Sequence, residues 1–146
     1  MEDIITFCGE VGDSLGKGLA ECIYQEGLCV LLRKNGYDYS KEVVIPITFN
    51  KISVGNVRAD IIVEDKIIIE CKAIDANLKP SHLPQIIVYM KTLGYDEGIM
   101  VNFNQNPSKD MVEIVKVKRE NEDVYSATID NKVYYIKGNG LLTDSL

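Results

Sequence analysis

Ionisable side chains stand inside two apolar, β-branched runs between Asp60 and Lys72. The polar tripeptide at positions 64–66 separates the runs, and this pattern is typical of a β-hairpin. Because side chains alternate along a strand, Glu70 and Lys72 share one face. A three-residue loop places Asp60 opposite Glu70, whereas a two-residue loop turns Asp60 to the other face. The register of the hairpin therefore decides whether the two carboxylates meet.

A three-residue loop pairs Val63 with Ile67 and Ile61 with Ile69. Only in this register could the two carboxylates act together. Two carboxylates at short distance repel each other, and a hard divalent cation such as Mg²⁺ or Mn²⁺ relieves that repulsion by accepting oxygen ligands from both. Lys72 carries only donors, so it is not a ligand but can orient a water or stabilise charge on a phosphate. The alternative is a solvated Asp–Lys–Glu cluster on a sheet surface.

A helix is expected from Asp13 or Ser14 to Gly36, because large apolar residues recur there at helical spacing. On this helix Gly18, Glu21 and Tyr24 lie three residues apart, and Gln25 follows one turn after Glu21. A glycine inside a helix costs about 1 kcal/mol relative to alanine, so Gly18 marks a close packing contact or the helix start. Taken alone, Glu21 fits a solvated helix residue. Residues 1–12 give only a weak helical signal.

Two strands are expected at 39–49 and 52–58, joined by a turn at 50–51, and the second runs on toward Asp60. Pro46 suits an edge strand or a bulge. After a loop at 73–79, the residues from Pro80 to Leu93 predict a second helix that Gly94 ends. The continuous apolar run at 98–103 then indicates a buried parallel or central strand.

Residues 104–146 contain three further strand-like runs, at 111–118, 124–129 and 132–136. Asp130 and Asn131 suit a hairpin turn between the last two. We expect an antiparallel β meander that packs on the same domain as residues 1–103. It could form a dimer surface or guide a substrate.

The composition of the 146-residue chain fits one globular domain. A net charge of −6 argues against tight nonspecific binding to nucleic acid, whose affinity comes mainly from basic side chains. No apolar run approaches the roughly 20 residues that span a bilayer, and the N-terminus is acidic where a signal peptide would be basic, so an intracellular, non-membrane protein is expected. The chain has four cysteines, which are expected to be reduced: Cys8, Cys22, Cys29 and Cys71. A zinc site is not expected, because His82 is the one histidine that could join them.

Several motifs together resemble the GxxExxY protein family, which is placed in the PD-(D/E)xK nuclease superfamily. They are Gly18-x-x-Glu21-x-x-Tyr24, Arg58-Ala-Asp60, Glu70-Cys-Lys72, Gln85 and Val101-Asn-Phe103. The likeness runs from about Gly16 to Phe103. It implies a restriction-endonuclease-like αβββαβ core, an α/β fold whose mixed central sheet is flanked by helices.

The resemblance also implies roles for individual residues. Asp60 and Glu70 look like metal ligands, with the Cys71 backbone carbonyl as a third and Glu21 completing the acidic cluster. Lys72 looks like the catalytic lysine and Gln85 like the glutamine of the second helix; Tyr24 and Tyr89 would support or line the site. One departure is Pro84, directly before Gln85, which would shift the second helix relative to the site.

The function expected from these residues is Mg²⁺- or Mn²⁺-dependent hydrolysis of phosphodiester bonds in DNA or RNA. A catalytically inactive module that binds nucleic acid or assembles with other proteins, as a homodimer for example, is the alternative. The acidic balance favours it somewhat, because few basic residues lie near the expected core: Lys17, Lys34, Arg58, Lys79 and Lys91. His82 could act as a general base, but a capping or solvent-facing role is expected for an isolated histidine before a helix.

Overall fold

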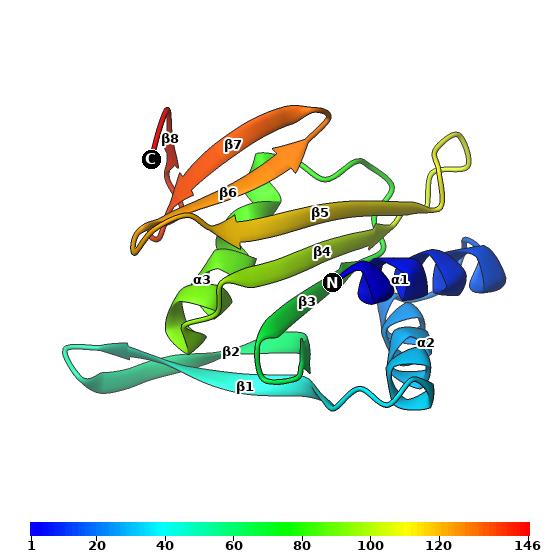
Figure 1. Cartoon of the computed structure of the whole chain (residues 1–146), viewed down its shortest axis with the longest axis horizontal. Coiled ribbons are helices and arrows are strands. Elements are labelled where there is room, and N and C mark those ends of the chain that lie inside the picture. The colour runs from blue at the N-terminus through cyan, green and yellow to red at the C-terminus, as the bar shows by residue number, and fades with distance from the viewer.

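The computed structural model describes residues 1–146 as one eight-stranded sheet with helices on both faces (Figure 1). The strands lie side by side in chain order from β1 to β8. Only β3 and β4 run parallel, and the remaining neighbours are antiparallel. The elements are α1 (Glu2–Leu15), α2 (Glu21–Lys34), β1 (Tyr39–Phe49), β2 (Ile52–Val63), β3 (Ile67–Lys72), η1 (Pro80–His82), α3 (Leu83–Leu93), β4 (Glu97–Phe103), β5 (Val112–Arg119), β6 (Val124–Ile129), β7 (Lys132–Lys137) and β8 (Leu142–Thr143). None of the helices is both long and apolar enough to cross a membrane.

The central strands β3 and β4 are buried on both faces, which explains their nearly unbroken apolar sequence. Ile67, Ile69 and Cys71 pack against α1 and α2, whereas Ile68 packs on the opposite side against α3. A parallel pair needs a crossover connection, and α3 provides it. The buried parallel strand expected at 98–103 and the mixed sheet are therefore confirmed.

The N-terminal part of the chain forms two helices, so the expectation of one helix beginning at Asp13 is wrong. In α1 the buried residues Ile4, Phe7, Cys8 and Val11 follow helical spacing. The chain then breaks, because Gly16 and Gly18 take left-handed φ angles of 70° and 100°. A Cβ placed on Gly18 meets nothing within 4 Å, so this glycine serves the break and not a packing contact. Apolar residues continue at helical spacing on both sides of the break, so the sequence pattern did not predict it.

The strands β1 and β2 form a long hairpin at the edge of the sheet, with Asn50 and Lys51 in left-handed conformations at its turn. β2 runs without interruption from Ile52 to Val63, as expected. Pro46 lies on the edge strand, where its missing N–H is tolerated. A register shift falls between Ile47 and Thr48.

The second helix follows the expected pattern. The short helix η1 leads into α3, where Pro84 occupies the first turn and lacks only an N–H that would have no partner there. Gly94 ends α3 in the left-handed conformation with φ 73°.

The C-terminal strands extend the core sheet. β5 pairs with β4 along its whole length, but β6 pairs with β5 at only three positions, from Val117 to Arg119. β6 then diverges toward β7 (Figure 1). The β6–β7 turn at Asp130 and Asn131 is confirmed, since both residues have left-handed φ angles of 51° and 63°.

All four cysteines are free. Cys8, Cys29 and Cys71 are buried among apolar side chains, whereas Cys22 is exposed. Cys22 lies on α2 outside the buried side of the helix, which is formed by Tyr24, Gln25, Leu28, Cys29 and Leu32.

Candidate active site

The β2–β3 hairpin has the register of the three-residue loop, with Val63 opposite Ile67 and Ile61 opposite Ile69. Regular pairing ends there, and side chains replace the backbone ladder at the next position. The Asp60 N–H donates to Glu70 Oε1 at 3.0 Å, and the Cys71 N–H donates to Asp60 Oδ2 at 2.7 Å. The two carboxylates therefore lie together where β2 leaves β3.

Burial makes this carboxylate pair difficult to ionise. Glu70 is only 4% exposed. That burial, followed by the charge of Asp60, raises the pKa of Glu70 to about 8. The pKa of Asp60 is also raised by burial, although the hydrogen bond from the Cys71 N–H opposes the shift. In the absence of a cation, the Glu70 carboxyl therefore keeps its proton at neutral pH.

Lys72 and Glu21 lie within electrostatic reach of the pair. Lys72 is half-buried, makes no ion pair within 4.0 Å, and its charge lowers the pKa of Glu70 and of Asp60. Glu21 is the first residue of α2, where partial desolvation and then the charge of Asp60 raise its pKa. The charges of Glu21 on α2 and of Lys72 on β3 therefore act on the carboxylate pair that forms between β2 and β3.

The donor set suits a hard divalent cation, although no three His, Cys, Asp or Glu side chains are arranged to hold an ion. Asp60 and Glu70 each use one oxygen on a backbone N–H, and the second oxygen of each has no hydrogen bond within the chain. Mg²⁺ is commonly held by one or two carboxylates and keeps several waters. The pair fits that mode, while Glu21 does not close onto it.

Gln85 and Tyr89 come from α3 on the opposite face. Tyr89 is buried and its hydroxyl donates to the Arg58 carbonyl at 2.9 Å, which anchors β2 two residues before Asp60. Burial and then the charge of Glu70 raise the pKa of Tyr89 to about 12, while its hydrogen bond with Gln85 lowers it. Gln85 itself is exposed on the surface of α3.

Tyr24 has a structural position. Its ring is fully buried and stacks on Phe103 with the ring centroids 4.6 Å apart. Its hydroxyl donates to the Gly16 carbonyl at 2.6 Å and accepts from the Leu19 N–H at 3.3 Å. Tyr24 therefore fixes the break between α1 and α2, and through it the start of the helix that carries Glu21.

Sequence reasoning missed Glu42, which lies on β1 beside the site. Its charge raises the pKa of both Asp60 and Glu21, and its Oε1 accepts from the buried Gln25 amide at 3.0 Å. The same amide lies 3.4 Å from the Asp60 carbonyl. Glu42 has a left-handed φ of 53°, which is strained for a residue within a strand. If the pairing at the 50–51 turn continued along β1 unchanged, Lys41 would lie opposite Asp60. The register shift between Ile47 and Thr48 places Glu42 opposite Asp60 instead.

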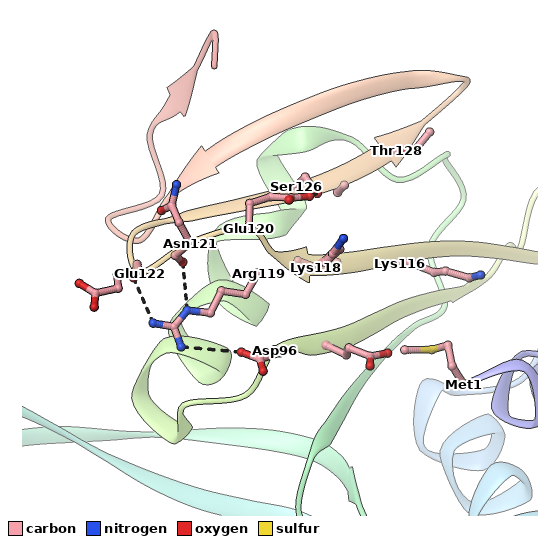
Figure 2. A pocket seen from close by; sticks show the side chains of 13 residues that line it. Met1, Asp96, Lys116, Lys118, Arg119, Glu120, Asn121, Glu122, Ser126 and Thr128 are labelled. Atoms are coloured by element: carbon pink, nitrogen blue, oxygen red, sulfur yellow. Dashed lines mark hydrogen bonds and ion pairs between the residues drawn. The ribbon is translucent and has the colours of Figure 1, made fainter. Parts of the chain in front are cut away.

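The largest cavity lies elsewhere (Figure 2). It has a volume of about 820 Å³ and opens where β6 diverges from β5. Its lining includes Glu97 at the start of β4, whereas Lys72 pairs with Asn102 near the end of that strand. The cavity and the carboxylate pair are therefore separate features at different ends of the central strands.

The αβββαβ core and the broken hairpin together define a restriction-endonuclease-like fold. A family model for the PD-(D/E)XK nuclease superfamily matches residues 1–115, and the chain belongs to that superfamily. The crystal structure of SSO0001 is similar in fold, with a TM-score of 0.52 and 22% identity over 66% of this chain. The chain spans about half of that structure, 48% of its length. No match is found among curated proteins.

Proposed function

We propose that this protein hydrolyses phosphodiester bonds in DNA or RNA with the help of Mg²⁺ or Mn²⁺, and that it belongs to the GxxExxY group through Gly18, Glu21 and Tyr24. The observation that carries the proposal is the contact between Asp60 and Glu70. Each carboxylate binds the backbone beside the other at a break in the sheet, and Lys72 follows within electrostatic reach. A buried acidic pair next to an ammonium group suits a cation and a phosphate together.

The proposed ligands are Asp60 and Glu70, with the Cys71 carbonyl as a third and Glu21 in the surrounding acidic shell. When bound there, the ion would polarise the scissile phosphate and lower the pKa of a water. Lys72 would position that water or offset the charge that develops on the phosphate. Gln85 would contact the substrate from α3, supported by Tyr89.

The charge state of Glu70 adds a requirement to this mechanism. A carboxyl group with a pKa of about 8 is mostly protonated at pH 7, and the proton must leave before the free Glu70 oxygen can serve as an anionic ligand. Cation binding should therefore release a proton and become tighter as the pH rises toward 8.

The test is calorimetric titration with Mn²⁺, followed by cleavage assays on single- and double-stranded DNA and RNA. The wild-type protein should bind Mn²⁺ and cleave at least one substrate. Asp60→Ala should lose both properties, and Lys72→Ala should keep Mn²⁺ binding but lose cleavage. Cleavage that persists equally in both variants rejects the proposal.

The second candidate is a binding or assembly module that keeps the fold and does not turn over. Two observations favour it: the net charge of −6 and the lack of a three-side-chain metal group. Mn²⁺ binding without cleavage of any of the four substrates would support this module. Measurement of the molar mass of the protein in solution would show whether it forms a homodimer.

A further inference from the structure

The loop that leads from Lys72 to His82 is held in place by polar side chains of β4 and β5. Asn102 is fully buried; its Nδ2 donates to the Ala76 carbonyl at 2.8 Å and its Oδ1 accepts the Ile74 N–H at 3.0 Å. Further along, both carboxylate oxygens of Glu113 accept the Leu78 N–H, at 2.8 and 3.0 Å. The carboxylate pair does not use these contacts, and they fix where the loop ends.

His82 is locked against the end of this loop. The Lys79 N–H donates to His82 Nδ1 at 2.9 Å, and the His82 N–H donates to the Lys79 carbonyl at 2.9 Å. The expected capping role of His82 is therefore confirmed. Because a backbone N–H can only donate, Nδ1 must be an acceptor, and the neutral ring carries its proton on Nε2. The free nitrogen is then a donor, which argues against the general-base role.

The groups around the ring are mainly cationic. Burial and then the charges of Lys72 and Lys79 lower the pKa of His82, which keeps the ring neutral. Glu113 opposes this shift, but its carboxylate is occupied by the Leu78 N–H. Lys79 is exposed and, like Lys72, makes no ion pair within 4.0 Å. The loop end before α3 thus offers the His82 Nε2–H, and the charges of Lys79 and Lys72 act on the same ring without an ion pair to any acidic side chain within 4.0 Å.

From this cluster we infer that His82 Nε2–H and Lys79 bind a backbone phosphate of the nucleic acid, next to the phosphate that Lys72 contacts. A phosphate offers only acceptors, which matches the donors of this loop end. Contacts of this kind position a nucleic acid without reading its sequence. The inference rests on the proposed function and adds a substrate contact from the loop before α3.

Two substitutions separate substrate contact from the capping role. In His82→Asn the Oδ1 atom can still accept the Lys79 N–H, but the shorter side chain places no donor at the position of His82 Nε2. In His82→Ala both functions are lost. With Ca²⁺ in place of Mg²⁺, His82→Asn should bind a labelled oligonucleotide about tenfold more weakly than the wild type, the loss expected for one hydrogen bond to a charged group. Its thermal unfolding should match that of the wild type, and its cleavage should show a raised KM with little change in kcat.

The chain has a single histidine, so its imidazole gives one set of NMR signals. The Nε2–H signal should move when the oligonucleotide is added, and less so in Lys79→Ala. A shift with inorganic phosphate alone, and none with the oligonucleotide, overturns the inference. Cleavage and binding that are unchanged in His82→Asn overturn it while the proposed function stands. Tight, His82-dependent binding without cleavage supports it while the nuclease proposal fails, and no binding by the wild type rejects both.

Discussion

The carboxylate pair and the cavity beside β6 are built from similar side chains, but they differ in their exposure to water. The cavity is large and charged, lined by Lys116, Lys118 and Arg119 among others (Figure 2). The pair of Asp60 and Glu70 occupies no large cavity and lies where two strands separate.

Their ion pairs show the difference. Arg119 lies 3.8 Å from Asp96, whose side chain is 79% exposed, and Lys116 lies 3.1 Å from Glu2, whose side chain is 82% exposed. Such contacts are weak because water screens them. Glu70, in contrast, is almost wholly buried beside a second carboxylate.

The comparison teaches that size is a poor guide to chemistry in this fold. The cavity opens where β6 leaves β5 after three paired residues. The carboxylate pair arises because side chains replace the ladder at a strand separation, and desolvation there changes what the groups can do. The predictions below set one feature against the other.

The largest expected effect comes from comparing two lysines. Lys72→Ala should lower kcat by about 10²–10³-fold, the range found when one charge-stabilising donor is removed from a transition state. Lys118→Ala, at the cavity, should leave kcat unchanged. The measurement is initial-rate cleavage with Mg²⁺. Equal losses in the two variants would erase the distinction between the regions.

The next effect concerns stability and pH. The pKa of Glu70 in the folded protein is about 8, against an ordinary value of 4.5, so the folded state holds the proton more tightly than the unfolded state. This contribution to stability is complete below about pH 4.5 and is lost as the pH rises toward 8. Glu70→Gln mimics the protonated form, so its metal-free unfolding midpoint at pH 9 should exceed that of the wild type by roughly 5 °C or more.

The control for that measurement is Glu120→Gln at the cavity, where Glu120 Oε1 accepts the Ser126 hydroxyl at 2.7 Å. Its midpoint should follow the wild-type pH profile in parallel. Added Mg²⁺ should raise the wild-type midpoint at pH 9 but not that of Glu70→Gln, because the amide is a poorer ligand for the cation. A Glu70→Gln midpoint that falls with pH as steeply as the wild type would contradict the burial argument.

The difference between the regions also explains what the sequence could predict. Loop length and alternation are local properties, and they narrowed the β2–β3 register to two choices. The structure has the three-residue loop, in which Asp60 and Glu70 meet. The second helix was predictable for the same reason, since Pro80, which begins the short helix η1 that leads into α3, and Gly94 mark its two ends.

Other features depend on contacts distant in the sequence or on backbone detail. Glu42 reaches the site only through a register shift in β1, which no residue type announces. The break at Gly16 and Gly18 was missed because apolar residues continue across it. The divergence of β6 from β5 has no local signal either, so the cavity could not be foreseen.

A smaller effect is expected from Gln25, the buried amide that joins Glu42 to the Asp60 backbone. Gln25→Leu keeps most of the volume but leaves two acceptors without this donor, so it should destabilise the protein by about 1–3 kcal/mol. Chemical denaturation measures this loss. Glu26→Gln, at the next position on α2 in an exposed pair with Lys41, is the control and should have little effect. If the two variants are equally stable, the Gln25 contact contributes nothing to holding the site.

The smallest effect is expected at the cavity itself. Lys116→Met removes the ion pair with Glu2, and the unfolding midpoint should change by less than about 1 °C because both side chains are largely exposed. Cleavage should also be unchanged, since Lys116 lies beside the cavity and apart from Asp60 and Glu70. An unchanged cleavage rate would be informative, because all three basic side chains of β5, Lys116, Lys118 and Arg119, line this cavity. A marked rise in KM for the oligonucleotide would show that the substrate extends across β5, and the two regions would then belong to one binding surface.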